Sequence, residues 1–94
     1  MNSEIPALAR GCRFRRAMHG AGTLLVPEGV VDLNSSASAI VELIDGKRTV
    51  EEIAVELSQR AAIDLQSMSS DVETLLQRLA AKCWLDLRDE GALR

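Results

Sequence analysis

The sequence predicts a small α+β domain of winged-helix type, in which a three-stranded antiparallel sheet is followed by a three-helix bundle. Three observations support this class: apolar residues alternate with basic ones early in the chain, the apolar spacing becomes helical after Asn34, and the chain has 94 residues. Because a chain of this length holds one hydrophobic core, we expect a single domain over residues 12–88. Residues 1–11 are expected to form a flexible arm, and residues 89–94 a frayed tail.

The three strands are predicted to precede the helices. Around Phe14, apolar and basic residues alternate, and the glycine-containing segment 19–22 predicts the turn that ends this first strand. Residues 23–26 form an apolar, β-prone run. The Pro-Glu-Gly sequence at 27–29 predicts a tight hairpin, because proline fixes φ and glycine accepts a positive φ. Residues 30–33 are then the third strand.

The first two helices are predicted from their capping residues. Asn34 is the expected N-cap of the first helix, and Gly46 is expected to end it. Thr49 and Glu52 have the spacing of a capping box, which predicts the start of the second helix. Apolar residues at helical spacing follow each cap, so both helices should bury one face.

The third helix is predicted after a looser stretch over residues 62–67, where Ser67, Ser69 and Ser70 are competing N-caps. Its apolar residues follow the helical period and should form a core seam. Apolar residues beyond the helix, including Trp84, are expected to close over the core. The seam comprises Met68, Val72, Leu76, Leu79 and Cys83, with Leu75 near its border.

Composition and charge exclude several classes of function. Eleven basic against fourteen acidic side chains give a net charge of −3, and 2% of the residues are aromatic, which argues against nucleic-acid binding through phosphate contacts or stacking. Cys12 and Cys83 have no neighbouring metal ligand, so we expect buried thiols and no metal site. No nucleophile–base pair or phosphate loop is present, so we expect no catalytic residue and no cofactor. Without a membrane-length apolar run or a signal-peptide pattern, we expect a cytoplasmic protein that binds no membrane.

An ordered series of turn, cap and core residues runs along most of the chain. It comprises Leu25, Pro27, Glu28, Gly29, Leu33, Asn34, Ile40, Asp45, Gly46, Thr49, Val50, Ile53, Leu57, Asp71, Val72, Leu76, Leu79, Trp84 and Leu85. Over about residues 6–87 this series resembles the PqqD family, the pyrroloquinoline quinone (PQQ) biosynthesis protein D. One departure is Cys83, because the family usually has glycine just before the terminal aromatic residue, where a left-handed helix cap forms.

The resemblance implies a non-catalytic peptide chaperone in PQQ biosynthesis. Such a domain binds the ribosomal precursor peptide PqqA and presents it to the radical SAM enzyme PqqE, and related domains serve other peptide-modification systems. The resemblance also implies that the peptide adds as a strand to the third strand of the sheet, beside the third helix.

The residues themselves agree with that implied site. An edge strand offers unpaired backbone groups to an added strand, and one border of the third helix combines an apolar residue with charged ones. That border can equally be a solvated helix surface, with acid at its start and base at its end as the helix dipole favours. The candidate peptide-binding residues are Val30, Val31, Asp32 and Leu33 on the strand, and Asp71, Leu75, Arg78 and Lys82 on the helix.

Two alternative functions and two oligomeric states stay open at this point. Three helices and a small sheet are also the architecture of a nucleic-acid-binding winged helix, and a recognition domain could serve a different modified peptide. The charges oppose the first alternative, because residues 69–82 sum to zero. An open edge strand permits both a monomer and a strand-exchanged homodimer.

Overall fold

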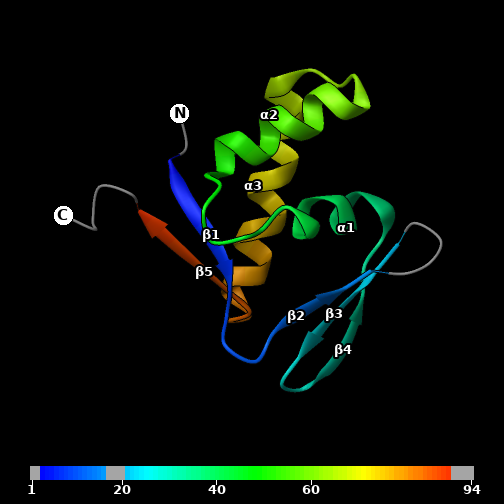
Figure 1. The fold of residues 1–94 in the computed structure, drawn as a ribbon, viewed down its shortest axis with the longest axis vertical. Helices are drawn as coiled ribbons and strands as arrows, with labels where there is room; N and C mark the ends of the chain where they lie inside the picture. Colours follow the sequence, from blue (N-terminus) through cyan, green and yellow to red (C-terminus); the bar gives the residue numbers. More distant parts are fainter. Residues whose placement is uncertain (1–2, 17–20, 90–94) are drawn as a thin grey trace.

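The computed structural model describes residues 3–16 and 21–89, which form three helices and two small antiparallel sheets (Figure 1). The elements are β1 (Glu4–Leu8), β2 (Arg13–Arg15), β3 (Thr23–Val26), β4 (Gly29–Asp32), α1 (Ser35–Glu42), α2 (Val50–Ala61), α3 (Leu65–Ala81) and β5 (Leu85–Asp89). The predicted α+β class is therefore confirmed, with a three-stranded antiparallel sheet and three helices after it.

One sheet contains β2, β3 and β4 in chain order. Phe14, Leu24 and Val31 lie opposite one another on its three strands and pack on the core, and the alternation in the sequence predicts this facing for Phe14. The turn between β3 and β4 has two residues, and Gly29 follows it with a φ of +150°. The predicted turn at residues 19–22 includes residues 19 and 20, which lie outside the described residues.

The second sheet pairs the two ends of the described chain. β1 runs antiparallel to β5, with Glu4 opposite Asp89 and Leu8 opposite Leu85. The prediction of a flexible arm is therefore wrong for residues 4–8, and Asp89 belongs to a strand rather than to a tail. The physical reason is that this pairing joins segments separated by most of the chain, so neither segment carries a local signal for the other. The expected fraying of residues 90–94 lies outside the described residues.

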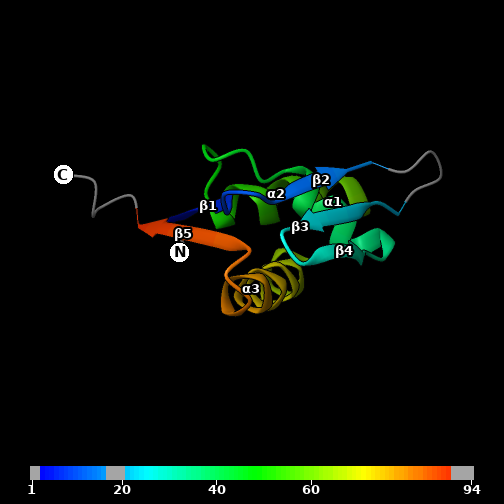
Figure 2. The same cartoon turned by 90° about the horizontal axis from the view of Figure 1, so that it is seen from below.

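The hydrophobic core lies between the helices and the inner faces of the sheets. Figure 2 shows α3 on one side of the molecule, with β4 the strand of the larger sheet that lies toward it. α2 packs along α3, and the capping box at its start is present as predicted, with Thr49 and Glu52 bonded to each other's backbone. The core-facing residues of α3 are Met68, Val72, Leu76 and Leu79, all buried, which confirms the predicted seam apart from its last position.

Two helix ends differ from the sequence-based expectation. α1 begins after Asn34 as predicted but ends at Glu42 rather than at Gly46. Beyond this end, the Asp45 carboxylate accepts the backbone N–H groups of Arg48 and Lys47, and these hydrogen bonds form a turn before α2 and hold the pKa of Asp45 below its usual value.

The N-cap of α3 lies three residues before the first predicted cap, Ser67. Asp64 is the N-cap, and its carboxylate accepts the backbone N–H of Ser67 over 2.8 Å. The serines expected as caps therefore lie inside the helix, because the aspartate three residues before Ser67 takes that N–H first. Hydrogen bonds from the Ser67 side chain and backbone lower the pKa of Asp64.

Cys83 does not belong to the buried seam. It lies just beyond the C-cap of α3 with a φ of +64° and is exposed, so the prediction that both cysteines are buried holds only for Cys12. The N–H groups of Cys83 and Trp84 donate to the carbonyls of Ala80 and Leu79, the hydrogen-bond pattern of a Schellman motif. The helix thus ends in the left-handed conformation that normally calls for glycine, with a cysteine in that position.

Candidate functional site

β4 is an edge strand, and no other described strand pairs with its outer side. Its register with β3 decides which backbone groups point outward. The N–H of Leu33 donates to the carbonyl of Gly22 over 3.0 Å, so position 33 bonds inward, and antiparallel alternation makes Val31 the next inward-bonded residue. The N–H and C=O groups of Val30 and Asp32 therefore point away from β3 and can pair with a further strand.

The four candidate residues on this strand have two roles in the structure. Val31 packs against the core and Leu33 is buried, so these two side chains fix the edge in place. Val30 is 64% exposed, and Asp32 is exposed too. The positions that present free backbone groups are thus the positions whose side chains face solvent.

A groove lies between the first half of α1 and the middle of α3, where β4 leads into α1. It has a volume of about 210 Å³ and takes residues from both helices. Three of the four candidate helix residues line it. Lys82 does not, because it is the exposed C-cap residue beyond the last turn of α3. The lining residues are Asn34, Ser36, Ala37 and Ile40 on the α1 side, and Asp71, Thr74, Leu75 and Arg78 on α3.

Side-chain hydrogen bonds at both ends of β4 hold this arrangement. At its start, the indole Nε1 of Trp84 donates to the Glu28 carboxylate, which joins the hairpin turn to the residue that follows α3. Near its end, the Asn34 side chain caps α1, and buried Ser38 on α1 accepts the N–H of Gly22 over 2.6 Å. These hydrogen bonds position the open edge against α1 and against the C-terminal end of α3.

The charges in the groove are of opposite sign and lie on one helix face. Asp71 and Arg78 are seven residues apart on α3, with half-buried Leu75 between them, and both charged side chains are exposed. An apolar centre with a carboxylate at one end and a guanidinium at the other can bind an amphipathic segment whose own charges match.

Sequence reasoning missed the α1 side of the groove. It identifies Asn34 as a cap and Ile40 as a core residue, but it assigns neither of them, nor Ser36 or Ala37, to a site. A signal is present in the run of small residues at the start of α1, because small side chains leave room beside a neighbouring helix. Which helix that would be depends on the tertiary packing, which the local pattern does not reveal.

The part of the chain that the structure describes offers few groups for catalysis or metal binding. Burial raises the pKa of the Cys12 thiol, and the nearby Glu28 and Asp86 carboxylates raise it further, so Cys12 stays protonated at neutral pH. No group of three or more His, Cys, Asp or Glu residues there is placed to hold a metal ion. Within the same residues, no helix is both long and apolar enough to cross a membrane.

Comparison with known sequences gives a consistent result. The family described as "Coenzyme PQQ synthesis protein D (PqqD)" matches residues 22–85. A protein of Pseudomonas paraeruginosa named "PqqA binding protein" is 36% identical over 86 residues, which cover 90% of this chain and 92% of the relative. A "Bifunctional coenzyme PQQ synthesis protein C/D" of Methylorubrum extorquens is 37% identical over 81 residues, or 85% of this chain and 22% of that longer protein.

Two solved structures share the fold. The PqqD part of PqqCD from Methylobacterium extorquens, described as a functional, stand-alone recognition element for ribosomally synthesised and post-translationally modified peptides, superposes with a TM-score of 0.78. It is 36% identical, and the match covers 92% of this chain and 93% of that one. TbiB1 in its complex with a TbiA leader peptide superposes with a TM-score of 0.73 at 20% identity, covering 85% and 94% of the two chains, which shows a common fold.

Proposed function

Since this chain belongs to the PqqD family, we propose that it is a non-catalytic recognition domain of PQQ biosynthesis, which binds the precursor peptide PqqA by strand addition. The relatives named for PqqA binding support the choice of peptide, because they align with nine-tenths of the chain. We further propose that the bound peptide is presented to the radical SAM enzyme PqqE. The domain's part in that step is to hold the peptide, and the chemistry belongs to the enzyme.

The observation that carries this proposal is the open edge of β4 beside the groove between α1 and α3. Val30 and Asp32 each direct an N–H donor and a C=O acceptor outward, so an added antiparallel strand would form the same ladder that β3 forms on the inner side. Backbone pairing of this kind supplies affinity without reading the peptide sequence.

Selectivity would then come from the groove. Side chains of an added strand point alternately to its two faces, so every second peptide residue would face α3 near Leu75. Arg78 would favour an acidic peptide side chain at one end, and Asp71 a basic one at the other. Lys82 lies beyond the groove, and its proposed contribution is attraction at longer range.

Calorimetric titration with PqqA tests this function directly. We expect one peptide to bind per domain, and we expect a peptide with the same composition in scrambled order to bind at least tenfold more weakly. A matched titration with random duplex DNA at low salt addresses the winged-helix alternative, and we expect no binding. If the scrambled peptide bound as well as PqqA, or if DNA bound with a strong salt dependence, the proposed function would be wrong.

A further inference from the structure

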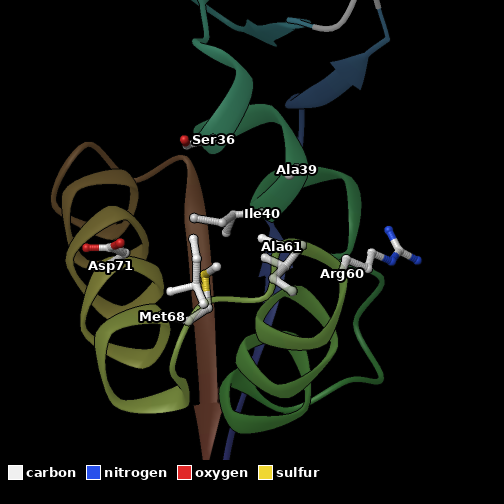
Figure 3. A pocket seen from close by; sticks show the side chains of 9 residues that line it. Ser36, Ala39, Ile40, Arg60, Ala61, Met68 and Asp71 are labelled. Atoms are coloured by element: carbon white, nitrogen blue, oxygen red, sulfur yellow. The ribbon is translucent and has the colours of Figure 1, made fainter.

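A second pocket adjoins the groove, farther from β4. It has a volume of about 270 Å³ and lies where α1, the C-terminal end of α2 and the N-terminal end of α3 meet. Figure 3 shows the side chains of Ile40, Ala61 and Met68, one from each helix, directed into the same space. The pocket thus has apolar walls contributed by all three helices.

The charged residues at this pocket do not point into it. Figure 3 shows the Arg60 side chain extending away from the space, and its Nε donates to the Glu56 carboxylate on the same helix over 2.8 Å. Asp71 lies on α3 at the opposite rim. A charged ligand would find no partner inside, so the pocket suits an apolar group.

The pocket and the groove are parts of one path. Ser36, Ile40 and Asp71 line both of them, so a chain that leaves the β4 edge along the groove reaches the pocket next. The apolar side chain of Ile63 is 44% exposed at the rim of the pocket.

We propose that this pocket is an anchor site for one apolar side chain of the bound peptide, an inference that rests on the proposed function. A volume of about 270 Å³ is below the roughly 300–1,000 Å³ of pockets that hold drug-sized ligands, but it accepts a single aliphatic or aromatic side chain.

The direction of the peptide follows from the pairing. An added strand antiparallel to β4 begins beside Asp32 and runs back toward Gly29, so the residues that precede it extend toward α1 and the pocket. The anchor residue therefore lies on the N-terminal side of the paired peptide segment.

Filling the pocket is the direct test. Ala61 is the exposed last residue of α2 and lines the pocket, so the phenyl ring of Ala61→Phe should fill the pocket. Peptide binding should then weaken by about tenfold or more, because the apolar side chain of the peptide stays in water. Ala81 is the exposed last residue of α3 and does not line the pocket, so Ala81→Phe is a matched control with unchanged affinity. Thermal unfolding of both variants verifies that they are folded.

The peptide side of the test identifies the anchor. Each apolar peptide residue N-terminal to the paired segment is replaced by alanine in turn. One of these replacements should lower the affinity of the peptide for the parent protein about tenfold, but its affinity for the Ala61→Phe variant less than twofold. The proposal is overturned if the Ala61→Phe variant binds PqqA as tightly as the parent. It is also overturned if the substitution changes the oligomeric state of the protein in the absence of peptide, since a second copy of the chain would then be the occupant of the pocket. If the parent itself binds no PqqA, the proposed function fails instead.

Discussion

The indole Nε1 of Trp84 donates a hydrogen bond to Glu28 Oε1 over 3.2 Å and thereby joins two residues 56 positions apart. Glu28 lies in the turn before β4, and Trp84 directly follows the left-handed end of α3. The carbonyl of Trp84 also accepts the N–H of Ala9 over 2.8 Å, beyond the end of β1. One residue thus connects the helix end, the second sheet and the hairpin that carries the open edge.

Removing the Glu28 carboxylate should loosen that connection. We expect Glu28→Ala to lower the free energy of unfolding by about 0.5–1.5 kcal/mol, toward the lower end because both groups lie near the surface. PqqA affinity should fall a few-fold, since the start of β4 is no longer held against α3. Glu28→Gln keeps an acceptor oxygen and serves as the control in urea unfolding and titration. Equal losses in both variants would show that the hydrogen bond contributes nothing.

The register of β4 makes opposite predictions for prolines at two neighbouring positions. Asp32→Pro removes an outward N–H, so PqqA should bind about tenfold more weakly while stability changes little. Val31→Pro removes an inward-bonded N–H and should lower the free energy of unfolding by roughly 2–4 kcal/mol. Asp32→Ala controls for the lost carboxylate. If Asp32→Pro bound PqqA as tightly as Asp32→Ala, strand addition at β4 would be excluded.

Neighbouring leucines on α3 should separate folding from binding. Leu76 is 1% exposed, so Leu76→Ala should lower the free energy of unfolding by roughly 2–5 kcal/mol through the cavity it leaves. Leu75 is half-buried and lines the groove, so Leu75→Ala should cost less stability but weaken PqqA binding in the folded protein. Denaturant unfolding and titration of both variants measure the two effects. The reverse ranking in stability would mean that the core face of α3 is misassigned.

The two cations on α3 should contribute unequally to binding. Arg78→Glu should weaken binding of a peptide with an acidic segment and reduce the salt dependence of its affinity, because Arg78 lines the groove. Lys82→Glu makes the same charge change outside the groove, so its effect should be smaller and confined to the association rate. Stability should stay within about 0.5 kcal/mol in both variants. Equal affinity losses would point to a general attraction rather than to the groove.

The left-handed residue at the end of α3 offers a stabilising substitution. Cys83 has a φ of +64°. A residue with a Cβ atom is destabilised in this left-handed conformation, whereas glycine is not. Cys83→Gly should therefore raise the free energy of unfolding by about 0.5–1 kcal/mol. Cys83→Ala removes the thiol but keeps the Cβ atom, so it should unfold like the parent. A destabilised Cys83→Gly would indicate that the thiol itself contributes to the fold.

Local signals account for most of what the sequence predicts correctly. The hairpin between β3 and β4, the caps Asn34 and Thr49 and the buried seam of α3 all depend on residues within a few positions of one another. The left-handed end of α3 is a partial case. The PqqD family usually has glycine at this position, and the chain adopts the glycine-like conformation there with a cysteine, Cys83.

Features that depend on distant segments could not be predicted in the same way. The pairing of β1 with β5 joins residues from opposite ends of the described chain, and the groove exists only because α1 packs beside α3. The candidate helix residues Asp71, Leu75 and Arg78 were identified from one helix surface, and the structure adds the opposing wall. The outward direction of the Val30 and Asp32 backbone groups needed the register, which a strand sequence alone leaves undetermined.

The pairing of β1 with β5 also determines how the polypeptide enters and leaves the fold. Glu4 lies opposite Asp89, so the incoming and outgoing backbone run side by side, on the other side of the molecule from β4 in Figure 1. A short linker between these two positions would close the backbone into a ring without breaking a strand, and new ends could then be opened in a loop. Circular permutation is thus compatible with this topology.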